Sequence, residues 1–487
     1  MIADPAALED LARNALETGN EEAVLDRLKR AAVEIGTARL WQWVGLLQRS
    51  LDRHEAAIDA FARAARLAPG DAGIAHGRAY VALEAGLPAV ALFETAWRLN
   101  PGSGEILTGL TSARFAAGEG DTAADQLALV VKNNPGWIDG HRALAQVRAL
   151  LSGKAAAGLS FAEAVTARSD QLALWEAWIA MLVAGELYRE ALDVVRRARR
   201  QFGASPWFDL HEAIALSEQG QIEPAEPLFA AIDDPAATVW RVRHLLRSDR
   251  ITEVLPLIDA RLDPADPALW PYGAIAWRLT GDPRWEWLDG QPGLVSVADL
   301  TGDLPPLDRL ADILRGLHLA RAEHLDQSVR GGTQTDGPLF SRTEPELRAL
   351  RAAIVRAVER HVAHLPAPDP RHPTLAKARD RRIRFAGSWS VRLAGQGHHA
   401  NHVHPQGWLS SAFYVALPDE AERGGGEAGW LTLGQPQAGL GLDLAPVRTI
   451  EPKPGQLVLF PSTMWHGTMP FAHGERLTVA FDVAQPR

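Results

Sequence analysis

The sequence predicts an α+β multidomain protein in which an α-helical solenoid precedes a domain of short β-strands with flanking helices. Amphipathic helical segments repeat about every 34 residues in the first half of the 487-residue chain. After residue 381 the pattern changes to short alternating apolar segments separated by glycine and proline. Four histidines then gather within residues 398–404. These features predict a helical array first and a histidine-bearing site among later strands.

Composition limits the classes of protein that this chain can belong to. A length of 487 residues exceeds what one hydrophobic core usually organises, so we expect two or three domains. A formal net charge of −10 argues against a general nucleic-acid binder, which would carry a basic face. The chain has no cysteine, which excludes disulfides, thiolate metal sites and cysteine nucleophiles. Any metal must therefore be held by histidine, carboxylate or water.

The beginning of the chain shows no targeting signal. The stretch "MIADPAALEDLARNALETG" lacks a basic region followed by an apolar core, as a signal peptide would have. No apolar run approaches the roughly 20 residues that a membrane helix needs. We therefore expect a cytoplasmic protein with no nucleic-acid and no membrane partner. The sequence leaves its oligomeric state open.

The helical repeat is marked by an alanine that is followed, four positions later, by a large apolar residue. Successive alanines lie 32 or 34 residues apart, and Ala23 extends the series towards the beginning of the chain. The pairs are Ala57/Phe61, Ala89/Phe93, Ala123/Leu127, Ala157/Phe161, Ala191/Val195 and Ala225/Phe229, and three units close with Pro69, Pro101 and Pro135. Each unit predicts two amphipathic helices that approach closely at the alanine, the second ended by proline.

This period, with its A-x3-F spacing and terminal proline, resembles the tetratricopeptide repeat over about residues 5–235. Because one unit cannot bury its apolar face alone, neighbouring units are expected to stack into a solenoid with a concave surface. The resemblance implies that this surface binds a peptide or protein, and a scaffold or dimerisation arm without a ligand is the alternative. We expect domains at 1–235 for the solenoid and 236–305 for degenerate, tryptophan-rich repeats that cap it and pack against the next domain.

Residues 306–487 are expected to form a third domain. Two helices are predicted, in "PLDRLADILRGLHLARAEHL" and "EPELRALRAAIVRAVERHVAHL", with residues 326–342 as an ordered loop between them. The predicted strands are "RIRFAGSWSVRL", "LSSAFYVAL", "GWLTLG", "GQLVLFP" and "RLTVAFDVA". Helices followed by short strands predict a β-barrel or sandwich with helices packed outside it.

Three histidines in this domain are candidates for a metal site. His402 and His404 lie on one face of an extended segment, about 6–7 Å apart at Cα, which is the separation that two ligands of one ion need. His466 directly follows a later strand. Arg476 and Thr478 share the polar face of "RLTVAFDV", and an arginine beside a metal suits bidentate capture of a carboxylate. A crowded surface loop is the alternative explanation of the H-x-H pair.

Residues from about 325 to 483 resemble a family of 2-oxoglutarate-Fe(II) oxygenases with a double-stranded β-helix (jelly-roll) fold. The matching stretches are "DQSVRGGTQT", "GSWSVRL", "HHANHVHPQGWLSSAFYV", "PKPGQLVLFPSTMWHGTMPF" and "RLTVAFDV". The resemblance implies that His402, His404 and His466 hold Fe(II), and that Arg476, assisted by Thr478, binds the distal carboxylate of 2-oxoglutarate. It implies a dioxygenase that consumes dioxygen and hydroxylates a side chain of a peptide or protein recruited by the repeats.

Further residues are candidates for contact with the co-substrate or substrate. Tyr414 could reach the co-substrate carboxylate through its hydroxyl, or could be a half-buried strand aromatic. Arg392 and Gln334 are additional candidates. His398 and His399 could line the mouth of the site or be loop histidines.

His404 departs from the common pattern of such oxygenases, which use two histidines and one carboxylate. We favour a working three-histidine centre, and the alternatives are a carboxylate from elsewhere in place of His404 or an inactive domain. Two other functions remain open: a cupin-like three-histidine dioxygenase without 2-oxoglutarate, and a non-catalytic adaptor. Against the cupin, Trp408 stands where common cupins place glutamate, and Arg476 would lose its role.

Overall fold

The computed structural model describes residues 4–486, which form two compact units. The first unit contains the chain up to Leu129 together with Asp336–Ala352, and the second contains Val130–Thr335 and Ala353–Pro486. The outermost residues of the expected domains, 1–3 and 487, lie outside the described part of the chain. The expected boundaries at 235 and 305 stay predictions.

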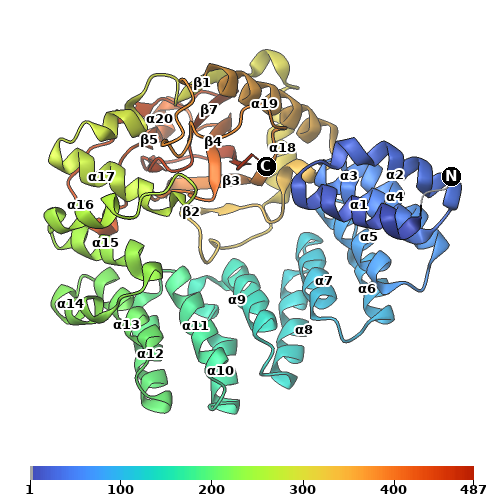
Figure 1. The fold of residues 1–487 in the computed structure, drawn as a ribbon, viewed down its shortest axis with the longest axis horizontal. Coiled ribbons are helices and arrows are strands. Elements are labelled where there is room, and N and C mark those ends of the chain that lie inside the picture. Colours follow the sequence, from blue (N-terminus) through green and yellow to red (C-terminus); the bar gives the residue numbers. More distant parts are fainter. Residues whose placement is uncertain (1–3, 487) are drawn as a thin grey trace. The chain divides into compact units, whose positions relative to one another are not determined.

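The first unit consists mainly of helices joined by short turns (Figure 1). Its repeat helices are α1 (Pro5–Thr18), α2 (Glu21–Ile35), α3 (Ala38–Ser50), α4 (His54–Leu67), α5 (Ala72–Glu84), α6 (Val90–Leu99), α7 (Gly104–Ala116) and α8 (Gly120–Asn133), the last of which crosses into the second unit. Pro69, Pro101 and Pro135 each lie two residues beyond the end of a helix, at α4, α6 and α8. Proline therefore ends the second helix of these repeats, as the sequence predicts.

Close packing of small and large residues explains the repeat. Phe61 is completely buried, and a Cβ at Gly45 in α3 or at Gly77 in α5 would overlap its ring. The two helices can therefore pack this closely on Phe61 only because these positions are glycine. The beginning of the series is wrong, because Ala23 is exposed. Its expected place in the core is taken by Leu25, so the first repeat is not in register with the others.

Helices continue through the first half of the second unit. They are α9 (Ile138–Ser152), α10 (Leu159–Ala167), α11 (Leu172–Ala184), α12 (Tyr188–Phe202), α13 (Pro206–Glu218), α14 (Ile222–Ala231), α15 (Thr238–Arg247), α16 (Ile251–Asp259) and α17 (Trp270–Thr280), followed by a π-helix at Glu286–Gly290. The α17 segment packs on the strand-rich domain. The Trp465 indole N–H donates to the carbonyl of Pro271 at 3.0 Å, and its ring meets Tyr272 edge-on at 5.7 Å. The tryptophan-rich segment therefore forms an interface, as expected.

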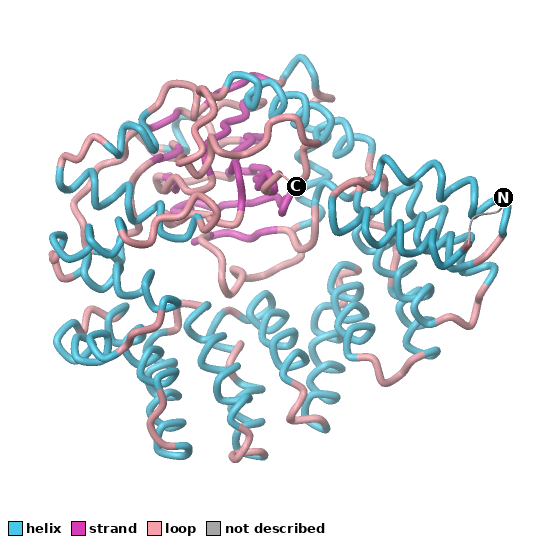
Figure 2. The backbone as a smooth tube through the Cα atoms, viewed as in Figure 1, coloured by secondary structure: helices cyan, strands magenta, loops and turns pink. Residues whose placement is uncertain are grey.

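The second half of this unit contains two antiparallel sheets (Figure 2). The strands are β1 (Ser296–Asp299), β2 (Val329–Gln334), β3 (Phe385–His399), β4 (Gly407–Ala416), β5 (Leu431–Leu433), β6 (Arg448–Ile450), β7 (Gln456–Pro461), β8 (His466–Thr468) and β9 (Arg476–Ala484). The larger sheet has the order β1-β7-β4-β9-β3-β2, and the smaller one has the order β6-β5-β8. Tyr414, Phe460, Leu431 and Ile450 form a core shared by both sheets. This is the predicted jelly-roll arrangement.

Helices flank these strands. They are α18 (Leu307–Leu317), α19 (Pro345–His364) and the short α20 (Glu420–Arg423), and α19 begins in the first unit. Among residues 4–486, no helix combines the length and apolar character that crossing a bilayer requires.

Three expected elements differ in the structure. Val329–Gln334 is a strand paired with β3 and not a loop, and a bulge at Gly331, whose φ is +69°, interrupts the alternation that would have marked it. The helix expected over 306–325 ends at Leu317. The next residue, His318, is not helical, and its ring forms hydrogen bonds with the hydroxyl groups of Thr333 and Ser390. Ser296–Asp299, expected to be helical, pairs with β7 as an edge strand.

A buried histidine makes the stability of the second unit depend on pH. His372 is 0% exposed; its Nε2 donates to the carbonyl of Leu288, while its Nδ1 accepts the backbone N–H groups of Thr374 and Leu375. Protonation of Nδ1 would break the last two bonds. Burial accordingly lowers the pKa of His372 to about 4.

We expect the free energy of unfolding to fall as the pH drops from about 6.5 to 4. In that window the unfolded chain binds a proton at His372 that the folded chain does not, so acid favours unfolding, by about 3 kcal/mol at pH 4. His372→Asn keeps an oxygen that can accept a backbone N–H but does not titrate. Its unfolding midpoint, measured against pH, should fall less steeply than that of the wild type. Parallel curves would contradict this account.

Candidate metal and co-substrate site

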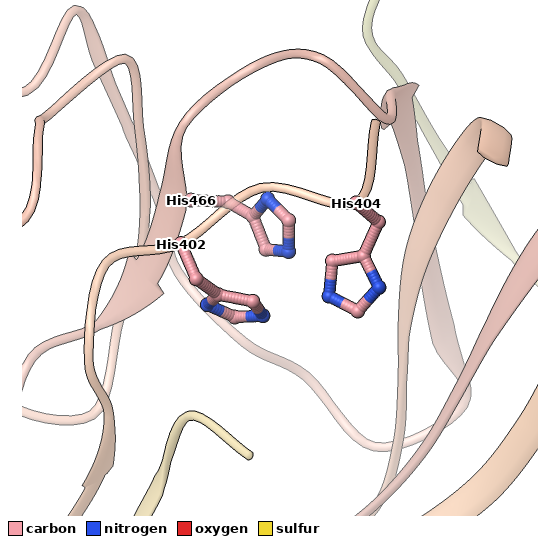
Figure 3. Close-up of side chains that lie close together, drawn as sticks. All are labelled: His402, His404 and His466. Carbon is pink, nitrogen blue, oxygen red and sulfur yellow. The ribbon is translucent and has the colours of Figure 1, made fainter. Parts of the chain in front are cut away.

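Backbone hydrogen bonds bring the three predicted histidines together. His402 and His466 form an antiparallel bridge, with N–O distances of 2.9 and 3.0 Å, and the His404 N–H donates to the carbonyl of Ser462 at 2.9 Å. The segment between β3 and β4 is thereby held against the segment that enters β8. One ring nitrogen from each histidine lies within 4.8 Å of the others, and Figure 3 shows the three rings converging. The structure thus groups His402, His404 and His466.

The hydrogen bonds of these rings select one tautomer. The Nδ1 atoms of His402 and His466 donate to the carbonyls of Ala400 and Met464 at 2.8 and 2.9 Å. His404 Nδ1 donates to Asp482 Oδ2 at 2.7 Å. Because these oxygens accept, each Nδ1 carries a hydrogen, so Nε2 is the ring nitrogen that could bind a metal; at His402 it lies 3.2 Å from the Ser328 hydroxyl oxygen. This is the state that a metal-binding imidazole needs.

Burial keeps the rings of His402 and His466 uncharged. It lowers the pKa of His402 well below its usual range, with the neighbouring His466 and His404 adding to the effect. It also lowers the pKa of His466 to about 3.

An ion about 2.1 Å from two ligand nitrogens at right angles would hold them about 3 Å apart. The three rings therefore need only a small closing movement to share one ion.

A buried arginine shares the cavity with the histidines. Arg476, which is 3% exposed, lies in the wall of the cavity that the three histidines line. Its Nη1 donates to the carbonyl of Gly429 at 3.1 Å, but its Nε has no partner of normal hydrogen-bond geometry. Within residues 4–486 no carboxylate forms an ion pair with this guanidinium. Burial lowers the pKa of Arg476, as expected for a desolvated cation. The cavity thus offers an uncompensated positive charge to an anionic ligand.

Comparisons with known proteins agree with this geometry. Residues 387–482 match the sequence model of a family described as "Putative 2OG-Fe(II) oxygenase", and residues 88–147 match a tetratricopeptide repeat model. The chain joins a tetratricopeptide segment to a domain of this oxygenase family. No curated protein matches the chain.

Three solved structures show similarity of limited extent. The "MamA RS-1 ArsTM double mutant" is 18% identical, with a TM-score of 0.30, over 35% of this chain and 99% of its own. A tetratricopeptide repeat protein from Parabacteroides merdae is 15% identical, with a TM-score of 0.29, over 48% and 95%. A Pseudomonas putida prolyl-4-hydroxylase is 16% identical, with a TM-score of 0.27, over 40% and 94%. At these scores none of the three carries an argument about function.

The other predicted co-substrate residues of the oxygenase domain lie in different places. Thr478 lines the cavity on the same strand face as Arg476. Tyr414 is completely buried in the core, opposite Thr478 in the sheet, and the Arg476 guanidinium lies 5.2 Å from its ring centre. Its hydroxyl, like Arg476 Nε, has no partner of normal hydrogen-bond geometry. Gln334 lines the cavity.

Arg392 requires a correction. Its side chain is 47% exposed and forms an ion pair with Glu475, with Nε 2.5 Å from Oε2, and it does not line the cavity. The reason is strand alternation: Val391 and Leu393 point into the core, so Arg392 must point the other way. The oxygenase domain therefore has one buried arginine at this site, Arg476.

Two residues that sequence reasoning missed line the histidine cavity. Ser328 Oγ lies 3.2 Å from His402 Nε2 and 3.2 Å from Nδ1 of His399, whose pKa burial lowers to about 3. Asp482 bonds His404 and is 8% exposed. Alternation along β9 could have found Asp482, since it lies an even number of positions after Arg476. Nothing local marked Ser328, which lies in the segment expected to be a loop.

Proposed function

We propose that the oxygenase domain is an Fe(II)- and 2-oxoglutarate-dependent dioxygenase. In this proposal His402, His404 and His466 hold the metal, and Arg476, with Thr478 and the Tyr414 hydroxyl, receives the distal carboxylate of 2-oxoglutarate. The observation that carries the proposal is one cavity that combines three imidazoles, each with its Nδ1 hydrogen-bonded and its Nε2 left as the possible metal ligand, and one buried guanidinium without a carboxylate.

The residues fit a dicarboxylate co-substrate bound between a cation and a metal. A buried cation without a counter-charge is costly, and a bound carboxylate would remove that cost through a charge-assisted hydrogen bond. Phe460, Leu431 and Trp389 contribute apolar surface to the same cavity. With iron, 2-oxoglutarate and dioxygen bound, such a centre oxidises 2-oxoglutarate to succinate and CO2 and hydroxylates a C–H bond. The side chains hold and orient the reactants.

We further propose that the substrate is a side chain of a peptide or protein recruited by the repeats. Contacts inside the second unit support this. The backbone N–H groups of Arg321 and Ala322 donate to the carbonyl of Leu150 in α9, at 2.8 and 3.0 Å. Leu325 packs on Ala149 and Ala157. Three residues further on, Ser328 lines the cavity. The wall of the site is thus built from a segment anchored on repeat helices, so a chain bound there would lie near the cavity.

A cupin-like dioxygenase without 2-oxoglutarate is the second candidate, because three histidines could also hold the metal of such an enzyme. It gives no role to the unpaired charge of Arg476. Trp408, at the position of a cupin glutamate, is buried and donates its indole N–H to the carbonyl of Thr374.

Anaerobic titration with 2-oxoglutarate tests the proposal without knowledge of the substrate. We expect 2-oxoglutarate to bind the Fe(II)-loaded protein and to produce a charge-transfer absorption band, because the metal and Arg476 bind it together. Binding to the metal-free protein should be much weaker. Iron binding without any 2-oxoglutarate binding would favour the cupin-like enzyme, and binding of neither would favour an adaptor.

A further inference from the structure

A carboxylate lies directly behind one of the three histidines. Asp482 on β9 is buried, and its Oδ2 accepts from His404 Nδ1 at 2.7 Å. Its Oδ1 accepts from the Ser410 hydroxyl at 2.6 Å, and Ser410 Oγ lies 2.9 Å from Ser462 Oγ. Asp482 is therefore held by Ser410 of β4, which also contacts Ser462 in the segment after β7, and its other oxygen accepts from the imidazole.

The sheet fixes this geometry. Ser410 and Asp482 are direct neighbours across β4 and β9, and the alternation of β9 puts Asp482 on the cavity face with Arg476 and Thr478. The Trp389 ring lies parallel to His404, at an interplanar angle of 11°. In the described chain no lysine or arginine forms an ion pair with Asp482. His404 is therefore the ionisable group that this carboxylate contacts.

The three histidines differ in what supports them. His402 and His466 donate to neutral backbone carbonyls, whereas His404 donates to a carboxylate. His404 also occupies the position that is a carboxylate ligand in the usual two-histidine, one-carboxylate iron site. The negative charge that a carboxylate ligand would bring is thus present on Asp482, which contacts His404 and not the metal position itself.

We propose that Asp482 is a positioning residue that supplies, through His404, the negative charge that a carboxylate ligand would supply directly. This inference rests on the proposed metal site. A carboxylate on Nδ1–H fixes the ring and raises the basicity of Nε2, and the loss of such a partner typically weakens metal binding about 10- to 100-fold.

The first test is Asp482→Asn, which keeps the size of the side chain and removes its charge. We expect the Kd for Co(II), used as an oxygen-stable probe, to rise about 10- to 100-fold, with the visible spectrum of bound Co(II) altered. The exposed Asp443→Asn changes the net charge equally and should leave the Kd within about twofold of the wild type. Equal affinities of the wild type and Asp482→Asn would overturn this inference alone. A wild type that binds no metal would overturn the proposed function as well.

A second background separates charge supply from a purely structural role. His404→Asp places a carboxylate at the metal position itself, where Asp482 would face a like charge. In that background Asp482→Asn should strengthen Co(II) binding, which reverses the sign of its effect next to His404. If Asp482 only holds β4 through Ser410, its loss should weaken binding in both backgrounds, and that result would contradict the proposal.

Discussion

Replacing His466 with alanine should abolish specific metal binding. His466 is 7% exposed, its Nδ1 is held by Met464, and its Nε2 faces the other two rings. Losing a ligand should weaken Fe(II) or Co(II) binding by more than the roughly 100-fold upper value for losing an outer partner. Isothermal titration under anaerobic conditions measures this, and the formation of succinate from 2-oxoglutarate should disappear with it.

His473→Ala is the matched control for this change. His473 is exposed in a bend near the start of β9, outside the cavity, and should keep wild-type metal affinity. The thermal unfolding midpoint of both variants shows whether the fold is retained. Full metal affinity in a folded His466→Ala protein would contradict the proposed centre.

Replacing Arg476 with methionine should weaken 2-oxoglutarate binding strongly while leaving metal binding nearly unchanged. Removing one partner of a buried charge pair costs about 2–5 kcal/mol, which corresponds to a rise in Kd of about 30-fold to several thousandfold. Arg476→Lys keeps the charge but loses the fork of donors, so its Kd should lie between those of methionine and the wild type. Titration of the metal-loaded variants with 2-oxoglutarate gives these values.

The same change should stabilise the protein in the absence of ligand. Arg476 is a buried cation without a carboxylate partner, and an apolar side chain of similar length removes its desolvation cost, so the unfolding midpoint should rise. Arg392→Met removes an exposed, paired arginine and should alter neither the midpoint nor 2-oxoglutarate binding appreciably. Unchanged 2-oxoglutarate binding in Arg476→Met would remove the arginine from the site.

Local periodicity explains why much of this fold could be predicted from the sequence. The alanine spacing and the helix-ending prolines act within a single repeat. They therefore predict the helices of every repeat in which the alanine lies in the core. Strand alternation likewise places Arg476 and Thr478 together on the cavity face. The resemblance to oxygenases supplied the pairing of His402 and His404 with the distant His466, which no local pattern could give.

The features that were missed depend on contacts between distant segments. The chain leaves its helix at His318 because Thr333 and Ser390 bond its ring, and neither lies within the helix. Strand β2 forms because β3, more than 50 residues later, pairs with it across a glycine bulge. The prediction for Arg392 fails for a different reason. Its charge suggests a role in the site, but strand alternation puts it on the face of β3 opposite to the buried Val391 and Leu393.

An anaerobic crystal structure of the protein with Fe(II) and 2-oxoglutarate tests the central claim most directly. It should show Nε2 of His402, His404 and His466 on one iron atom, with the distal carboxylate of 2-oxoglutarate on Arg476 and Asp482 still bonded to His404 Nδ1. Iron bound by Asp482 in place of His404, or 2-oxoglutarate bound away from Arg476, would contradict it.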